Sequence, residues 1–205
     1  MQNLEEVLRR LQHHGITVKH AKCHFLKDAV KYLGHKVDAD GIHTTTKKVK
    51  AVQQAPRPGN QQQLRSFLGL LQYYGKFIPN LSTLINPLNS LLLKNQPWKW
   101  TDECEQAFTE AKMALSSASI LVHYNPHLPL QLAADASAYS VGAVISHIFP
   151  NGEERPIAYA SRTLTSSEKN YSQLKKKALS LIFGVRKFYQ YLYGRRLPST
   201  LITSP

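Results

Sequence analysis

The sequence predicts an α+β protein in which a mainly helical part precedes a small α/β domain. Residues 130–135 alternate between two faces, with Leu130, Leu132 and Ala134 on one and Gln131, Ala133 and Asp135 on the other. This alternation is the period of a strand with one buried face. Two more strand-like runs, 141–148 and 155–162, follow within hairpin range, and a long helical pattern covers about 166–191. Earlier in the chain, apolar residues recur at helical spacing instead.

The first 43 residues predict one helix followed by short strands. Four apolar residues recur at helical spacing: Leu4, Val7, Leu8 and Leu11. We expect strands at 16–19 and 30–37 and a turn at Asp40-Gly41. Lysines scattered through these strands suit a phosphate backbone, and they equally serve to prevent edge pairing.

The next segment, from Thr44 to about residue 125, predicts several helices. A short basic helix runs to Pro56, and Asn60 with Gln63 makes a capping-box-like start for the next helix. That helix carries an apolar stripe: Leu64, Phe67, Leu68, Leu71 and Phe77. Its flanks carry Arg65, Tyr73, Tyr74 and Lys76. Such flanks suit nucleic-acid contact, and an ordinary amphipathic core helix gives the same pattern.

Two further helices and the final strands complete the prediction. We expect a short helix at 88–93, and a longer one that begins after Thr101 as N-cap. Pro150-Asn151-Gly152 predicts a hairpin turn, Thr165 caps the last long helix, and a final strand starts near Ser199. Asp135, at the end of the first of these strands, is either a turn former or a place to hold a metal ion.

Composition limits the classes of function. The 205 residues carry a formal net charge of +13, with the basic excess in residues 1–60 and 129–205, which indicates a polyanionic partner such as nucleic acid or merely solvated basic faces. No run predicts a membrane span, and the charged N-terminus is not a secretion signal. Two cysteines favour a reducing, intracellular setting, and the His/Cys-rich residues 13–24 match no zinc spacing.

Five motifs, taken in order, carry a family resemblance. They are VKYLGHKVDADGI, LRSFLGLLQYYGKFIPNLSTLINPL, WKWTDECEQAF, DASAYSVGAVIS and RPIAYASRTLTSSEKNYSQL. Together they cover nearly the whole chain, and they strongly resemble the polymerase polyprotein of gypsy-type long-terminal-repeat retrotransposons.

The resemblance implies a truncated reverse transcriptase palm and thumb followed by an incomplete ribonuclease H-like α/β domain. Residues 1–43 match the end of the palm with a primer-grip-like hairpin, 44–125 the thumb and connecting helices, and 126–205 the first part of the ribonuclease H-like domain. The implied nucleic-acid contacts are Gly34, His35, Arg65, Tyr73, Tyr74 and Lys76.

The resemblance also shows which catalytic groups this sequence lacks. Polymerisation in the family needs an aspartate cluster with a Tyr-x-Asp-Asp turn, which this sequence does not contain. The family's ribonuclease H site holds Mg²⁺ with several carboxylates, of which Asp135 matches the first, while Lys177 and Ser204 stand at two others. We therefore expect no Mg²⁺ to bind and Asp135 to be a vestigial ligand.

Helical spacing indicates where Lys177 lies. We expect a buried stripe on the last long helix, formed by Leu174, Ala178, Leu181, Ile182 and Val185. Lys177 then lies at the edge that faces the sheet and pairs with Asp135, while Lys175 turns outward. An ordinary solvated lysine is the alternative.

These expectations favour a retrotransposon-derived reverse transcriptase/ribonuclease H fragment that binds an RNA–DNA hybrid or duplex without catalysis, in the cytoplasm or nucleus. Three alternatives stay open: an active RNA-directed DNA polymerase or ribonuclease H component completed by another chain, a domesticated protein-interaction module, and an untended reading frame with no role. The sequence does not determine the oligomeric state.

Overall fold

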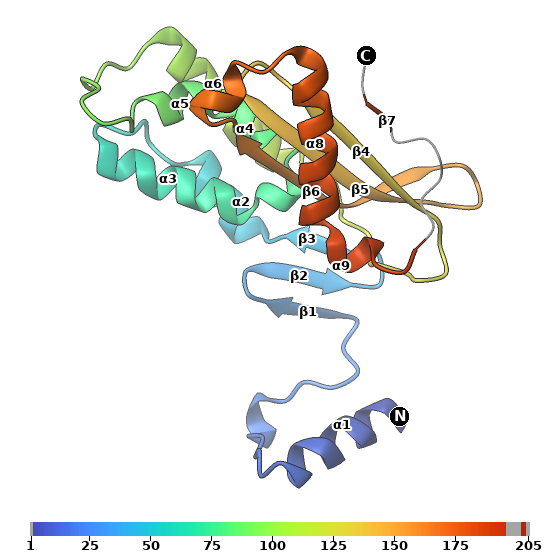
Figure 1. Ribbon diagram of the computed structural model, residues 1–205. Helices are drawn as coiled ribbons and strands as arrows, with labels where there is room; N and C mark the ends of the chain where they lie inside the picture. The colour runs from blue at the N-terminus through green and yellow to red at the C-terminus, as the bar shows by residue number, and fades with distance from the viewer. Residues whose placement is uncertain (1, 196–201, 204–205) are drawn as a thin grey trace.

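The computed structural model describes residues 2–195 and 202–203, and it has the α+β character that the sequence predicts (Figure 1). The first part holds α1 (Gln2–His13), η1 (His20–Lys22), β1 (Ala29–Tyr32), β2 (His35–Asp38), β3 (Ile42–Thr44), α2 (Thr46–Gln53), α3 (Gln61–Tyr73), η2 (Gly75–Phe77), α4 (Leu81–Leu84), α5 (Asn86–Ser90) and α6 (Asp102–Ser116). The second part holds β4 (Leu130–Ala136), β5 (Ser140–Ile148), β6 (Glu154–Thr163), α7 (Ser166–Lys169), α8 (Gln173–Lys187), α9 (Tyr189–Leu192) and β7 (Ile202–Thr203).

The first sheet is an antiparallel meander of β1, β2 and β3, and α1 stands apart from the rest of the molecule (Figure 1). The strand expected at 30–37 is instead a hairpin, because Leu33 and Gly34 both adopt positive φ, 44° and 73°, and reverse the chain. The strand expected at 16–19 does not form, since that segment has no strand partner among the described residues.

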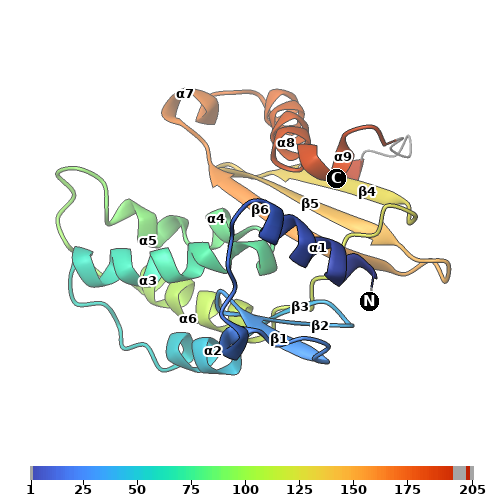
Figure 2. The same cartoon turned by 90° about the horizontal axis from the view of Figure 1, so that it is seen from below.

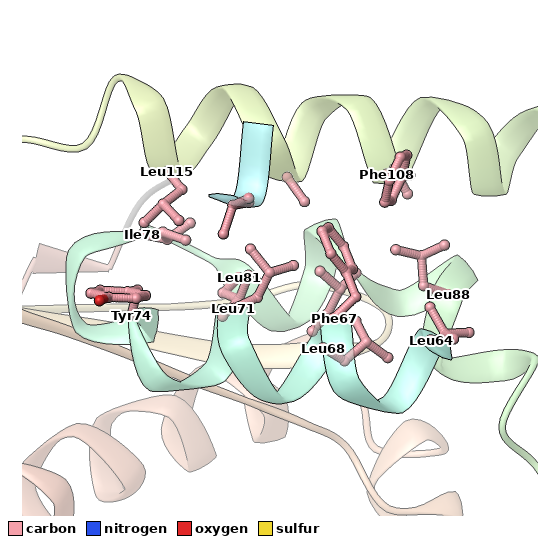
Figure 3. Close-up of a cluster of buried hydrophobic side chains, with 14 of the residues drawn as sticks. Leu64, Phe67, Leu68, Leu71, Tyr74, Ile78, Leu81, Leu88, Phe108 and Leu115 are labelled. Carbon is pink, nitrogen blue, oxygen red and sulfur yellow. The ribbon is translucent and has the colours of Figure 1, made fainter. Parts of the chain in front are cut away.

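The helical core between α3 and α6 confirms the predicted apolar stripe of α3 (Figure 3). Leu64, Leu68 and Leu71 are buried, and the rings of Phe67 and Phe108 from α6 lie 4.7 Å apart. Both predicted caps form: the Asn60 side chain accepts from the Gln63 amide, and that of Thr101 accepts from the Cys104 amide. Each cap supplies an acceptor to an N–H group that the helix leaves unpaired.

The second sheet has the strand order β6-β5-β4-β7, and helices cover both of its faces (Figure 2). β4 is antiparallel to β5 and parallel to β7, with Ala134 opposite Thr203. On one face, α8 approaches so closely that a Cβ on Gly184 would lie 3.0 Å from that of Ala143. On the other face, η2 and α4 contact β6.

The predicted helix from 166 to 191 is three helices rather than one. α7 begins with the capping box of Thr165 and Glu168, as the sequence predicts, and ends after one turn. α8 starts anew because the Ser172 side chain accepts from the Lys175 amide and acts as its N-cap. α9 follows after Phe188, which is buried and does not continue α8.

The predicted buried stripe of α8 is wrong. Leu174, Ile182 and Val185 are 79%, 51% and 41% exposed, and the buried positions are Lys176, Ser180 and Gly184. The physical reason is the close approach of α8 to the sheet, which only small residues permit at the centre of the contact. Lys177 is half-buried and Lys175 is exposed.

Among residues 2–195, every helix is too short or too polar to span a lipid bilayer. Cys23 and Cys104 are both free thiols.

Candidate nucleic-acid interface

Two tyrosines at the end of α3 hold the tip of the β1–β2 hairpin. The hydroxyl of Tyr73 donates to the Leu33 carbonyl, and the hydroxyl of Tyr74 donates to the Gly34 carbonyl at 3.1 Å. Gly34 has a φ of +73°, and a Cβ there would lie 3.1 Å from the Tyr74 hydroxyl, so both the turn and the tyrosine contact favour glycine at this position. The hairpin tip is therefore fixed against the C-terminal end of α3.

His35 lies inside this aromatic cluster. Its ring stacks on that of Tyr73 with centroids 5.3 Å apart and 2° between the planes, and it meets Tyr74 edge-on. Burial lowers the pKa of His35, and the positive charge of Lys76 lowers it further, so the imidazole is held neutral. Its Nδ1 is buried without a hydrogen-bond partner among the described residues.

The outward face of α3 presents polar groups beside the clamped hairpin. Arg65, Gly69 and Tyr73 follow one another at a spacing of four residues, and all three are exposed. No atom lies within 4 Å of a Cβ built on Gly69, so this face is open. Arginine and tyrosine flanking a small residue can meet a phosphate backbone and stack on a base.

The other predicted contacts lie deeper than expected. Tyr74 is only 1% exposed and belongs to the helical core, which leaves it no ring face for a base to stack on. Lys76 is half-buried, with its Nζ 5.2 Å from the centre of the Phe77 ring, and burial lowers the pKa of its ammonium group. The fold thus gathers Gly34, His35, Tyr73, Tyr74 and Lys76, while Arg65 lies two turns away along α3.

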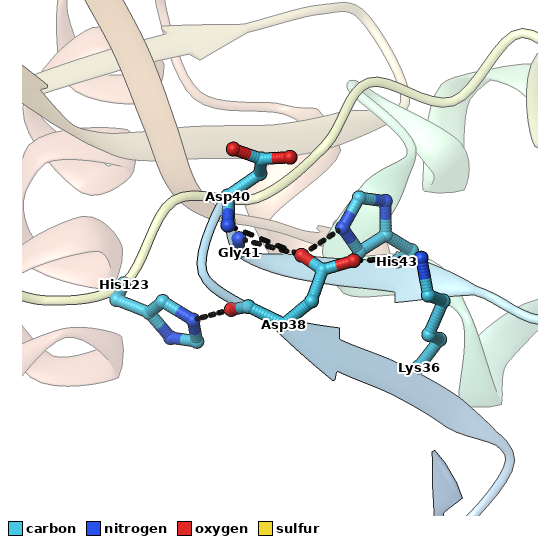
Figure 4. Close-up of polar contacts among 6 residues, drawn as sticks. All are labelled: Lys36, Asp38, Asp40, Gly41, His43 and His123. Atoms are coloured by element: carbon cyan, nitrogen blue, oxygen red, sulfur yellow. Dashed lines mark hydrogen bonds and ion pairs between the residues drawn. The ribbon is translucent and has the colours of Figure 1, made fainter. Parts of the chain in front are cut away.

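At the other end of the hairpin, Asp38 organises a polar network (Figure 4). Its carboxylate accepts from Lys36 and His43, each at 2.7 Å, and from the backbone amides of Asp40 and Gly41. The hydrogen bond from Lys36, then that from His43, holds the pKa of Asp38 far below its usual range. His123 bonds to the Asp38 carbonyl at 2.7 Å and so ties this turn to the segment that leads into β4.

We expect Asp38→Asn to destabilise the protein near pH 5 and to have less effect as the pH falls. The folded pKa of Asp38 lies below the unfolded value of about 3.9, so its contribution is present above pH 4 and is lost as the carboxylate becomes protonated. Urea unfolding at pH 5 and at pH 3 measures the difference, with Asp40→Asn as the control on the same turn. A gap between wild type and Asp38→Asn that is as wide at pH 3 as at pH 5 would exclude this electrostatic role.

Asp135 lies near the carboxyl end of β4, opposite Gly142 of β5. Its neighbours Leu132 and Ala143 lie under Gly184 of α8, so strand alternation turns Asp135 to the other face, where it lines a cavity of about 130 Å³ with Pro79 and Asn80.

Lys177 comes from the opposite side of the sheet but near the same strand end. The side chain of Gln173, one turn before it, donates to the Ala136 carbonyl at 3.2 Å, which places the start of α8 at this end of β4. The pairing of Lys177 with Asp135 stays a prediction, and Ser204 lies outside the described residues.

The side chains present do not fit a divalent metal. Mg²⁺ requires several oxygen ligands, and the residues that line the cavity with Asp135 include no second carboxylate. Within residues 2–195 and 202–203, no three His, Cys, Asp or Glu residues are grouped so that they could hold a metal ion. This includes the His/Cys-rich segment near the N-terminus.

Sequence reasoning missed two cations that the fold brings near Lys76. Arg162 on β6 and Lys187 on α8 line the same cleft as Lys76 and Tyr73. Their separation along the chain is large and no motif connects them, so only the packing of the sheet against η2 and α3 reveals this group.

Comparison with protein families and curated sequences gives consistent matches. Residues 100–198 match the model of the RNase H-like domain found in reverse transcriptase. The matched region begins just before α6. Over 203 residues, or 99% of this chain, the sequence is 32% identical to the Transposon Tf2-3 and Tf2-4 polyproteins of Schizosaccharomyces pombe (strain 972 / ATCC 24843). The chain spans 15% of the length of those polyproteins.

Comparison with solved structures also finds similarity to reverse transcriptases. The foamy viral protease-reverse transcriptase dRH in complex with double-stranded DNA has a TM-score of 0.76 and 28% identity, over 95% of this chain and 34% of that chain. The foamy viral protease-reverse transcriptase in complex with an RNA/DNA hybrid has a TM-score of 0.76 and 28% identity, over 96% of this chain and 27% of that one.

Proposed function

Because this chain carries the RNase H-like domain found in reverse transcriptase and is related along its length to gypsy-type LTR retrotransposon polyproteins, we propose that it binds an RNA–DNA hybrid or duplex without copying or cleaving it. The chain spans a small part of those polyproteins, so their activities as whole proteins do not transfer to it.

The observation that carries the binding proposal is the open face of α3 beside the fixed hairpin tip. Arg65 and Tyr73 lie exposed on that face, and Tyr73 is anchored by its hydrogen bond to Leu33 and its stacking on His35. A side chain that is already ordered loses little conformational entropy when it meets a ligand. The net charge of +13 supports a polyanion, and the two similar foamy viral proteins were solved with double-stranded DNA or with an RNA/DNA hybrid.

The proposal that cleavage is absent rests on the groups around Asp135. Metal-dependent phosphodiester hydrolysis uses two metal ions held by several carboxylates, and the neighbouring helix supplies Lys177 instead. An ammonium group near the site opposes binding of a divalent cation. In this proposal Asp135 is a vestigial ligand whose charge Lys177 offsets.

We expect the purified chain to shift the fluorescence anisotropy of a labelled RNA–DNA hybrid and to leave that hybrid intact in Mg²⁺. Arg65→Gln should weaken binding about tenfold, since it removes a charged contact to phosphate. Gel analysis of the same samples measures cleavage, and Arg9→Gln on the distant α1 is the matched control for the lost charge.

Calorimetric titration of Mg²⁺ into wild type and Lys177→Glu then tests the site itself. Tight Mg²⁺ binding by wild type, or repeated turnover of the hybrid, would refute the proposed loss of catalysis. A hybrid that causes no anisotropy change would refute the proposed binding.

A further inference from the structure

A polar cleft of about 470 Å³ lies where the end of α3, η2 and the following helices meet β6 and α8. Three cationic side chains line it from three segments of the chain: Lys76, Arg162 and Lys187. No aspartate or glutamate is among its lining residues, although the chain carries 13 acidic residues in all. A concave surface with charge of one sign concentrates the field and attracts counter-ions.

Two of the three cations lack an acidic partner in the part of the chain that the structure describes. The guanidinium of Arg162 forms a two-pronged pair with Glu168 at 2.7 and 2.9 Å, which lowers the pKa of Glu168 to about 2 and fixes Arg162 in place. Lys76 and Lys187 form no ion pair with any carboxylate in residues 2–195. Half-buried Lys76 therefore keeps an ammonium group that burial disfavours and that an anion would stabilise.

The remaining walls supply hydrogen-bond donors. Gln72 and Asn89 contribute side-chain amides, and Thr163 contributes a hydroxyl. The inner wall is rigid because the Ser161 hydroxyl accepts from the Ser82 amide at 2.9 Å and donates to its hydroxyl at 3.0 Å. Amides, a hydroxyl and ammonium groups around one cavity are the donors that a phosphate oxygen prefers.

We propose that this cleft binds a phosphate group through Lys76 and Lys187. The inference rests on the proposed nucleic-acid binding, which would supply a backbone phosphodiester, and a free phosphate offers the same chemistry. Tyr73 joins the cleft to the open face of α3, so a strand that follows α3 would bring a phosphate to its mouth. The cavity volume lies within the range of about 300–1,000 Å³ usual for ligand clefts.

The test compares Lys76→Gln with Lys175→Gln, a matched loss of charge at an exposed position on α8. Anisotropy of a labelled DNA duplex is measured over a range of salt concentrations. We expect Lys76→Gln to weaken binding about tenfold and to reduce the slope of log K against log salt by about 0.9, the value for one lost phosphate contact. Lys175→Gln should leave the slope unchanged, and Lys187→Gln should behave like Lys76→Gln.

A second arm separates the sources of phosphate and the two proposals. Inorganic pyrophosphate is added to wild type and Lys76→Gln, and the thermal midpoint of each is recorded. A rise confined to wild type assigns the cleft to free phosphate even if the duplex does not bind, in which case only the proposed function fails. If the duplex binds equally to all four proteins and pyrophosphate changes no midpoint, the cleft proposal is overturned while nucleic-acid binding stands.

Discussion

Replacement of Gly41 by alanine is expected to lower the free energy of unfolding by about 3 kcal/mol. Gly41 has a φ of +148°, and a Cβ at this position would lie 2.2 Å from the Leu121 carbonyl oxygen. That oxygen accepts from the Ile42 amide at 2.8 Å, and the Leu121 amide donates back to Ile42 at 3.1 Å. The new methyl group must break this pairing or displace the backbone, because the nearest atom belongs to the main chain and not to a flexible side chain.

Urea unfolding of Gly41→Ala measures this loss, with Gly152→Ala as the control. Gly152 also has a positive φ, +80°, but nothing lies within 4 Å of a Cβ built there. The control should therefore lose only the cost of the left-handed backbone, about 1 kcal/mol. Equal losses in the two variants would mean that the contact between the β2–β3 turn and the segment before β4 contributes nothing to stability.

Replacement of Leu71 by alanine is expected to cost about 2–5 kcal/mol, since it removes buried methyl groups and leaves a cavity. Leu71 is fully buried in the core between α3 and α6, close to Leu81 (Figure 3). Leu71 belongs to the same core cluster as Tyr74, whose hydroxyl bonds to the hairpin tip.

Leu174→Ala is the matched control, because the same substitution on α8 occurs at a side chain that is 79% exposed. We expect a change within about 0.5 kcal/mol, as for other surface sites. Chemical denaturation of both variants measures the change in the free energy of unfolding. A large loss for Leu174→Ala would contradict the exposed placement of this residue and restore the stripe that helical spacing predicts.

The two ends of the β1–β2–β3 meander contact different parts of the molecule. The Leu33-Gly34 tip is fixed by Tyr73 and Tyr74, whereas the Gly41 turn is tied to the segment before β4. The hairpin therefore bridges the helical core and the chain leading into the second sheet. Changes at either end are expected to alter how the face of α3 is presented to a ligand.

The sequence by itself determined the local elements of this fold. Asn60, Thr101 and Thr165 cap helices where they were expected, because an N-cap needs only an acceptor side chain and the next three amides. The apolar stripe of α3 and the alternation in β4 likewise follow from the fixed periods of helix and strand. The motifs also identified the family to which the comparisons point.

Only the tertiary structure decided which faces are buried and which distant residues meet. Apolar residues lie on more than one side of α8, so its sequence permits several sides to face the sheet. In the structure the side with the small residues Ser180 and Gly184 faces the sheet, and Leu174 is left exposed. The sequence predicts Tyr74 as a nucleic-acid contact. In the structure its ring is buried in the core and its hydroxyl bonds to Gly34. Such outcomes depend on the shape of surfaces formed by segments far apart in the chain, and local spacing carries no information about them.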